Sequence, residues 1–571
     1  MRPLFIGYTN PTQETDAGDP QRRQKVDLTF QDLVTHVHGV GATRSGKSKW
    51  LEWFCRQLYQ EGAGFTVIDP QGALAKALVS YFAYIRPRRP VIYFDPSRTD
   101  YLVPFNAFRS GYDEVSKRVA KQVEALLRVW NVENSDETPR LERWLRCIFH
   151  LFATGLISLN EVSYLLTWTH VAIREHAVQA LKDNPMIQNE WLELLAYKKP
   201  QDFAAQIESA RNRLFRFAEP RQIRRIMSIE ERSLDFGAIF EQGAILIVNL
   251  QESRSFSEEN ARLIGTLMIN ELWAAARSRP KPPKAPYFLL IDEVPRFLTP
   301  DIKDILDRGA GKGLHLGVFH QHLTQFKAQD PWTFESVMTN AKVKLVFGGL
   351  TKEDALLMVD EIFANQIQYD EVKFTIEQTK FWPVYGRDTV SMSSRGGARG
   401  SATSTLAGVS AGQAITTFPD TDGFYNIPGP ITDTTGASQA EGRSQSEAAM
   451  WSDGEADIPI FYPVPFKEVS SIETYTLEEQ RNRLADCLKE QYQRHYFVKR
   501  PGQKTVAAVT PFVKEFRIFP KREEAYVLEH LIKPYALPVE GIDQQLQDRL
   551  KKLEREAKQG AKRLPEFKTR E

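Results

Sequence analysis

The chain has 571 residues, more than one hydrophobic core holds, so its length predicts several domains. Its 74 Lys and Arg residues nearly balance 73 Asp and Glu residues, which excludes a general attraction for nucleic acid and leaves only local basic surfaces. The three distant cysteines (Cys55, Cys147 and Cys487) and the lack of a long apolar run or signal-peptide pattern indicate a reducing compartment and a chain that does not span a membrane.

Residues 1–30 carry several Pro and Gly residues and predict an irregular N-terminal arm with one short strand at 4–8. The organising motif follows at residues 41–48, which read GATRSGKS and fit the phosphate-loop pattern G-x-x-x-x-G-K-[ST]. A strand-like run at 36–40 precedes this motif, and a helical pattern begins near Trp50, which is the context that a phosphate loop requires.

The predicted ligands of this loop are ATP and Mg²⁺. Lys47 is expected to contact the β- and γ-phosphates, and the Ser48 hydroxyl to complete the Mg²⁺ shell. The phosphates would lie in a nest of amides at a helix N-terminus. The residues expected to form this nest are Gly41, Ala42, Thr43, Arg44, Ser45, Gly46, Lys47 and Ser48.

Short apolar strands at 64–69 and 91–94 each end in Asp-Pro, and alternate with helices as in a parallel sheet. Residues 111–234 then show apolar residues at helical spacing and predict an all-α insertion. The strand pattern resumes at 244–250 and is followed by a helix at about 257–277.

The run at 287–291 is apolar and ends in Asp292 and Glu293. In a phosphate-loop ATPase, Asp292 would hold the Mg²⁺ shell and Glu293 would polarise the attacking water. A strand at 314–320 ends at Gln321, which is a candidate sensor of the γ-phosphate, and a strand at 343–349 is expected to close the sheet.

Residues 386–455 are rich in Gly, Ser, Thr and Ala and predict a flexible segment. The remainder, 456–571, is expected to be a C-terminal appendage with a helix at 477–492, a strand at 495–498 and a charged helix at 544–562. Because acids and bases alternate along this last helix, we expect a solvated or partner-facing surface rather than a nucleic-acid arm.

These segments together resemble the HerA/FtsK superfamily of P-loop ATPases, and within it the coupling proteins of type IV secretion (TraD/TraG-like). The resemblance implies an α/β fold: a RecA-like core (31–110 and 235–385) with a mainly parallel sheet, interrupted by an all-α domain (111–234). It also implies a hexameric ring that hydrolyses ATP between subunits and moves DNA, as in conjugation. The matching segments are GATRSGKS (41–48), FTVIDPQG (65–72), DPSRTDYLVPFNAF (95–108), LLIDE (289–293), GLHLGVFHQ (313–321) and TNAKVKLVFG (339–348).

The resemblance further implies an arginine finger, for which Arg308 is the candidate and Lys312 the reserve. Most coupling proteins carry an N-terminal membrane anchor, which this sequence lacks. We therefore expect a cytoplasmic protein that partners recruit to the inner membrane, with a relaxase, a nuclease or the secretion machinery as those partners. The alternative is a HerA-like ring that serves as motor or scaffold for a nuclease or relaxase in DNA processing or defence. A small-molecule kinase on the same loop is disfavoured, because no lid or acceptor site is recognisable.

Overall fold

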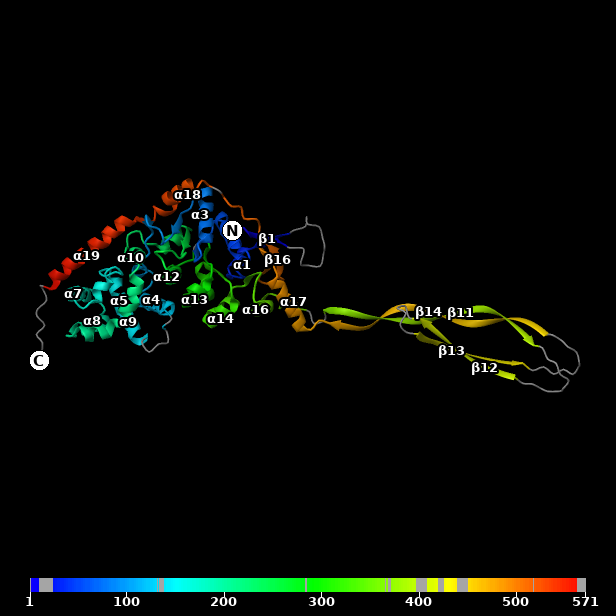
Figure 1. Cartoon of the computed structure of the whole chain (residues 1–571). Helices are drawn as coiled ribbons and strands as arrows, with labels where there is room; N and C mark the ends of the chain where they lie inside the picture. Colours follow the sequence, from blue (N-terminus) through cyan, green and yellow to red (C-terminus); the bar gives the residue numbers. More distant parts are fainter. Residues whose placement is uncertain are drawn as a thin grey trace. The chain divides into compact units, whose positions relative to one another are not determined.

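The computed structural model describes residues 2–9, 24–130, 132, 138–282, 285–364, 366–367, 371–396, 408–419, 426–438, 450–516 and 518–561. The chain divides into two compact units (Figure 1). The first comprises Met1–Ile367 and Leu477–Glu571, and the second, Gln368–Thr476, is inserted into it. Among the described residues, no helix is both long enough and apolar enough to cross a bilayer.

A parallel sheet forms the centre of the first unit. Its spatial order is β10-β3-β9-β8-β4-β7-β5, and every neighbouring pair is parallel. All residues of these strands are buried, as expected for a parallel sheet covered by helices on both faces. The strands are β3 (Val37–Val40), β4 (Gly64–Asp69), β5 (Val91–Phe94), β7 (Ile245–Asn249), β8 (Tyr287–Ile291), β9 (Leu314–His320) and β10 (Val343–Phe347). The predicted α/β fold with a mainly parallel sheet is confirmed.

The sheet does not close at β10, so the prediction that the strand at 343–349 closes it was wrong. Four antiparallel strands continue it in the order β15-β16-β1-β2. They come from both ends of the chain: β1 (Leu4–Thr9), β2 (Lys25–Leu28), β15 (His495–Lys499) and β16 (Val506–Val509). Strands from the expected N-terminal arm and C-terminal appendage therefore belong to the central sheet, because β15 pairs along the free edge of β10.

Helices next to the phosphate loop and the carboxylate strand follow the predicted pattern. The long helix α12 begins after Ser257, whose side chain accepts a hydrogen bond from the Asn260 amide, and carries two glutamates in its first turn. The helices of the core are α1 (Phe30–Leu33), α2 (Lys47–Gln60), α3 (Ala73–Ile85), α11 (Phe236–Glu241), α12 (Glu258–Ser278), α13 (Pro300–Arg308), α14 (Leu323–Gln329), α15 (Pro331–Asn340), α16 (Lys352–Ile362) and α17 (Leu477–Lys489).

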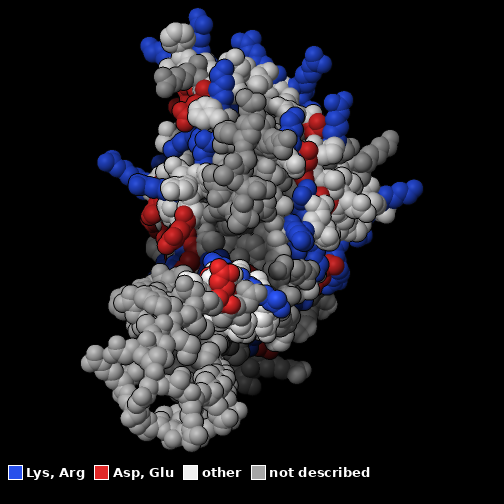
Figure 2. Space-filling model, turned by 90° about the vertical axis from the view of Figure 1, so that its right-hand side faces the viewer, with Lys and Arg blue, Asp and Glu red and all other residues white. Residues whose placement is uncertain are grey.

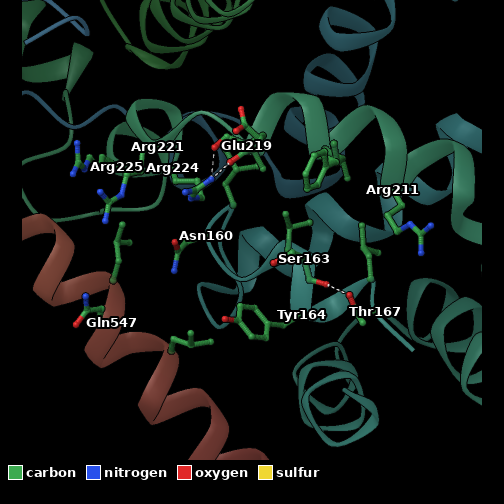
Figure 3. Close-up of a pocket in the computed structure, with 18 of the residues that line it drawn as sticks. Asn160, Ser163, Tyr164, Thr167, Arg211, Glu219, Arg221, Arg224, Arg225 and Gln547 are labelled. Atoms are coloured by element: carbon green, nitrogen blue, oxygen red, sulfur yellow. Dashed lines mark hydrogen bonds between the residues drawn. The ribbon is translucent and has the colours of Figure 1, made fainter. Parts of the chain in front are cut away.

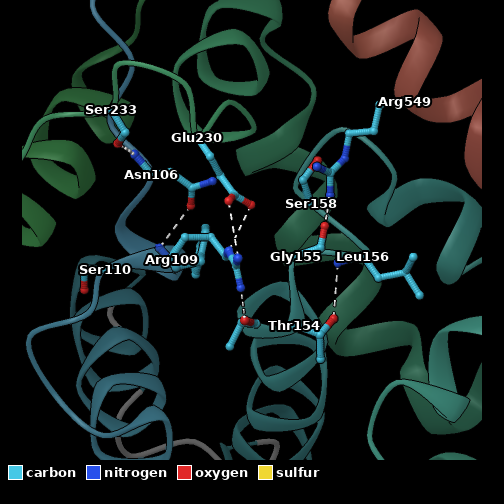
Figure 4. A network of polar contacts seen from close by, with 12 residues as sticks. Asn106, Arg109, Ser110, Thr154, Gly155, Leu156, Ser158, Glu230, Ser233 and Arg549 are labelled. Carbon is cyan, nitrogen blue, oxygen red and sulfur yellow. Dashed lines mark hydrogen bonds and ion pairs between the residues drawn. The ribbon is translucent and has the colours of Figure 1, made fainter.

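The described residues between 111 and 234 form helices and no strand, as the sequence predicts. Helices α5, α7, α8, α9 and α10 lie together in Figure 1. Arg109, on the connection into these helices, pairs with Glu230 on the connection out of them at 2.9 Å (Figure 4). The helices are α4 (Val115–Val129), α5 (Thr138–Thr154), α6 (Val162–Leu165), α7 (Val171–Gln179), α8 (Pro185–Ala196), α9 (Pro200–Ala218) and α10 (Arg221–Met227).

The charged C-terminal helix α19 (Val539–Ala561) packs on these helices, where it contacts α7 and α10. Its apolar side chains Ile542, Leu546, Leu553 and Ala557 are buried, although its remaining surface is rich in Lys, Glu and Gln. The expectation of a solvated or partner-facing helix therefore holds for its polar side only, because these apolar positions form a packing stripe. Helix α19 is preceded by the α-helix α18 (Pro520–Tyr526) and a π-helix at Val527–Ile532.

The second unit is built from long strands. β11 (Val372–Gly396) pairs antiparallel with β14 (Met450–Thr474), and β12 (Gly408–Pro419) pairs with β13 (Asn426–Ser438). The sequence predicted no strand within 386–455, and the predicted core limit at residue 385 lies inside β11. Parts of that predicted flexible segment, 397–407, 420–425 and 439–449, lie outside the described residues. Small polar residues give weak strand signals, so the pairing was not visible from composition.

Candidate nucleotide-binding site

The phosphate loop lies between the end of β3 and the start of α2. Its Gly46 has φ 112° and Arg44 has φ 65°, so the backbone turns through the left-handed region twice. A Cβ atom on Gly46 would stand 2.9 Å from the Arg494 amide nitrogen. The glycine is therefore required both by its backbone angle and by the close approach of residue 494.

Lys47 is buried, with 6% of its surface exposed, and its side chain points back into the loop. Its Nζ donates hydrogen bonds to the carbonyl oxygens of Gly41 at 2.9 Å and His320 at 2.8 Å. Burial lowers the pKa of this ammonium, whereas the nearby carboxylates of Asp292 and Glu293 oppose the shift. The Ser45 hydroxyl is also buried and has no hydrogen-bond partner among the described residues. The loop thus offers a cation and an unsatisfied hydroxyl, which fits a polyphosphate.

Two carboxylates follow β8 at the same edge of the sheet. The Ser48 hydroxyl donates to Oδ2 of Asp292 at 3.5 Å. Burial, aided by Asp69 and Glu293 and opposed by Lys47, raises the pKa of Asp292 to about 7. A hydroxyl beside a buried carboxylate is a donor set that suits Mg²⁺, whose charge would hold Asp292 ionised. Glu293 has φ 67°, which is uncommon for a residue other than glycine and directs its carboxylate by backbone constraint.

Gln321 joins the loop to the second carboxylate. Its Nε2 donates to Oε2 of Glu293 at 2.9 Å, and its Oε1 accepts a hydrogen bond from the Thr43 hydroxyl at 2.7 Å. The structure therefore brings together the sequence-predicted residues Lys47, Ser48, Asp292, Glu293 and Gln321 at the carboxyl ends of β3, β8 and β9.

The candidate arginine finger lies elsewhere. Arg308 ends α13 with 69% of its side chain exposed, and it pairs with Asp304 one turn earlier on the same helix at 2.7 Å. The reserve candidate Lys312 lies in the turn after α13, where its carbonyl oxygen accepts a hydrogen bond from Arg279. An exposed position is compatible with action on a neighbouring subunit, which stays a prediction.

Two supports of the site escaped the sequence analysis. Nε2 of His38 lies 2.7 Å from Nε2 of His320, so the two buried rings share one hydrogen bond between β3 and β9, and burial lowers the pKa of both. The alternating His36 and His38 were visible, but their partner 282 residues away was not. His36 is likewise structural: its Nδ1 accepts a hydrogen bond from the Leu316 amide.

The second support is the chain after α17. The Arg494 amide donates to the Ser45 carbonyl at 2.9 Å. The Gly349 amide donates to the Lys489 carbonyl at 2.9 Å, and the Ala42 amide donates to the Gly348 carbonyl at 3.1 Å. Residues 489–494 thus support the phosphate loop, directly through Arg494 and indirectly through Gly348 and Gly349. In the sequence, the inserted unit separates these residues from the strands of the parallel sheet.

The parallel sheet, the strand–loop–helix motif and the paired carboxylates define an α/β fold of the P-loop NTPase type. No protein-family model matches the sequence. No curated protein matches it either.

The solved structures that resemble this chain include a bacterial conjugative coupling protein and VirB4. The bacterial conjugative coupling protein TrwBdeltaN70 in its unbound monoclinic form has a TM-score of 0.49 and 13% identity, covering 87% of this chain and 89% of that one. The trigonal form in complex with sulphate also has a TM-score of 0.49 and 13% identity, with coverage of 91% and 96%. VirB4 of Thermoanaerobacter pseudethanolicus has a TM-score of 0.39 and 12% identity, with coverage of 63% and 87%. Because one fold hosts many functions, activity has to be argued from the site.

Proposed function

We propose that this protein is a Mg²⁺-dependent ATPase that couples ATP hydrolysis to the movement of DNA through a ring of identical subunits. The observation that carries the proposal is the convergence of Lys47, Ser48, Asp292, Glu293 and Gln321 at one edge of the sheet. Each of these side chains can perform one of the tasks that phosphoryl transfer to water requires.

The roles follow from the contacts. Lys47 would exchange its two carbonyl acceptors for phosphate oxygens and neutralise charge that develops on them. Ser48 and Asp292 would hold Mg²⁺, which supplies electrostatic stabilisation of the phosphates. Glu293 would accept the proton of the attacking water, and Gln321, already bonded to it, would orient that water. Arg308 of a neighbouring subunit would complete the site.

The DNA part of the proposal rests on the resemblance of the motifs to those of DNA-pumping ATPases. Figure 2 shows Lys and Arg side chains projecting from the described part of one face, with Asp and Glu among them. Since the whole chain carries a formal charge of only +1, contact with DNA would use local basic positions and weaken steeply with salt.

A second candidate function is an ATP-dependent scaffold in which the ring recruits a nuclease or relaxase. The observation that favours it is the second unit, where large side chains such as Trp382 and Tyr385 are exposed on β11 and available to a partner. Glu293→Gln separates the two functions, because this variant would bind ATP without hydrolysing it. Full DNA transfer by this variant in cells would favour the scaffold, and loss of transfer would favour the motor.

The direct test is ATP hydrolysis by the purified protein with and without DNA at low salt, together with its mass in solution. We expect hydrolysis stimulated by DNA in a ring-sized oligomer, and none in Lys47→Ala. A DNA-indifferent ATPase would refute the translocase and leave the nucleotide site intact.

A further inference from the structure

A second pocket in the first unit lies far from the phosphate loop in sequence and has no part in the function proposed above. It has a volume of about 850 Å³ and is lined by α6, α9 and α10 on one side and by α19 on the other (Figure 3). This volume is within the range of small-molecule sites, roughly 300–1,000 Å³.

Arginines dominate the charge of the pocket. Arg211, Arg221, Arg224 and Arg225 line it, opposed by the two carboxylates of Glu219 and Asp543. In the view of Figure 3, Arg211 lies at the opposite end of the lining from Arg221 and Arg225. Positive charge is thus placed at both ends of the pocket.

The arginines differ in whether their guanidinium groups already make ion pairs or hydrogen bonds within the protein. Arg225 makes a two-point ion pair with Asp543, at 2.8 and 2.6 Å, and Arg224 donates to the backbone at Glu219. Arg221 is 69% exposed and its nearest carboxylate, Asp543, is 4.0 Å away. Arg211 is exposed on α9. Arg211 and Arg221 are therefore available to an anion from solution.

The remaining lining is a mixture of aromatic and polar side chains. Tyr164 on α6 and Phe215 on α9 contribute aromatic surface, and 60% of Phe215 is exposed although it lines the pocket. Asn160, Ser163 and Gln547 add polar groups to the lining (Figure 3). The lining therefore combines aromatic surface with hydrogen-bonding side chains, which suits a ring that itself carries hydrogen-bonding atoms.

The wall made by α19 is fixed. Beside the Arg225–Asp543 pair, Arg549 donates to the carboxylate of Glu161 at 3.1 Å and to the Gly155 carbonyl at 2.6 Å (Figure 4). Glu161 is fully buried, so its ion pair with Arg549 holds α19 firmly against the helices of residues 111–234.

We propose that this pocket is a second binding site, for a phosphorylated small molecule of nucleotide size. One of the two available arginines, Arg211 or Arg221, binds its phosphate, because a planar guanidinium donates two parallel hydrogen bonds to phosphate oxygens. Tyr164 and Phe215 contact its ring. Because α19 forms a wall opposite α9 and α10, the pocket favours a small ligand over a nucleic-acid strand lying along α9.

The same helix provides a matched control. Arg213 and Arg216 line a separate pocket with Arg140, on another side of α9. A strand of nucleic acid lying along α9 would use arginines of both pockets, whereas a small ligand in the first pocket would use Arg211 or Arg221 and neither Arg213 nor Arg216.

The test uses full-length Lys47→Ala protein, so that the phosphate loop does not contribute, with AMP and ribose 5-phosphate as calorimetric probes and a 20-nucleotide oligo(dT) as a third probe. We expect AMP to bind more tightly than ribose 5-phosphate, and Arg211→Gln with Arg221→Gln to weaken AMP at least about tenfold, the cost of one charged hydrogen bond. Arg213→Gln with Arg216→Gln should leave AMP binding unchanged. Thermal unfolding confirms that both double variants fold.

Three results would overturn the proposal. The first is that neither small probe binds at millimolar concentration. The second is equal AMP affinity before and after Arg211→Gln with Arg221→Gln. The third is that AMP does not bind, whereas oligo(dT) binds and both double variants weaken its binding to the same extent. That result would assign α9 to nucleic-acid binding instead.

Discussion

Gln321 bridges the Thr43 hydroxyl of the phosphate loop and the carboxylate of Glu293, with hydrogen bonds of 2.7 and 2.9 Å. Any ligand that moves Thr43 must therefore also affect the group proposed to activate water. In the proposed ATPase, this connection would couple phosphate binding to hydrolysis.

The first prediction concerns this bridge. Gln321→Ala removes both hydrogen bonds while Lys47 and the loop amides remain, so kcat should fall roughly a hundredfold with little change in KM. Steady-state ATP hydrolysis measures both constants. Gln325→Ala, on the exposed side of α14, is the control and should retain full activity. A raised KM with normal kcat would instead assign Gln321 to ground-state binding.

The second prediction compares two neighbouring lysines. Lys47 is buried and donates to two carbonyls inside the loop, whereas Lys49 is 46% exposed and pairs with Glu52 at 3.1 Å. Lys47→Ala should weaken ATP binding roughly 10- to 100-fold, because one or two charged hydrogen bonds to phosphate are lost. Lys49→Ala should leave the Kd within about twofold. If titration calorimetry shows the same loss of ATP affinity in both variants, the loss comes from removing a positive charge and not from the position of Lys47.

The active edge of the sheet was predictable because its signals are local. The loop spans eight consecutive residues, and Asp292, Glu293 and Gln321 directly follow buried apolar strands. Parallel strands place their carboxyl ends at one edge, so residues distant in sequence could be grouped without a structure.

The supports of that edge were not predictable, because they depend on pairings between distant segments. β15 pairs with β10 about 150 residues away, and β1 pairs with β16 about 500 residues away; short strands carry no signal that selects such partners. The same holds for the His38–His320 bond and for the contact of Arg494 with Gly46. Arg308 was chosen by its place before β9, which says nothing about a neighbouring subunit.

The third prediction tests whether the inserted unit is separable. The Tyr475 amide donates to the Glu371 carbonyl at 2.9 Å, so the two ends of the insertion lie side by side. Beyond them, α16 and α17 pack together, and Arg481 pairs with Asp360 at 2.6 Å. Replacing residues 372–474 by Asn-Gly, a favoured two-residue turn, should preserve the first unit.

We expect this shortened protein to unfold within a few degrees of the parent and to hydrolyse ATP at a similar basal rate. Circular dichroism melting and an ATPase assay measure the two properties. A molten or insoluble product would show that the insertion stabilises the segment 489–494 behind the phosphate loop. If DNA transfer is lost while basal ATP hydrolysis is intact, the second unit acts in a step that follows ATP hydrolysis.

The fourth prediction concerns a buried acid away from the nucleotide site. Glu271 lies in α12 with Oε2 buried and without a hydrogen-bond partner among the described residues. Burial raises the pKa of Glu271 from the usual 4.5 to about 7; Arg118 opposes this shift, whereas Asp113 and Asp301 add to it. The folded state therefore binds the proton more tightly than the unfolded state, and the stabilisation is lost as the pH rises through 7.

Between about pH 5.5 and about pH 8, this group should lower the free energy of unfolding by about 2 kcal/mol. Glu271→Gln stays neutral at both values, so its free energy of unfolding should fall less over that range, and it should be more stable than the parent at the higher pH. Urea unfolding at both values measures the difference. Glu259→Gln, exposed in the first turn of the same helix, controls for the loss of one charge and should follow the parent. A pH dependence of Glu271→Gln equal to that of the parent would mean that another group carries the effect.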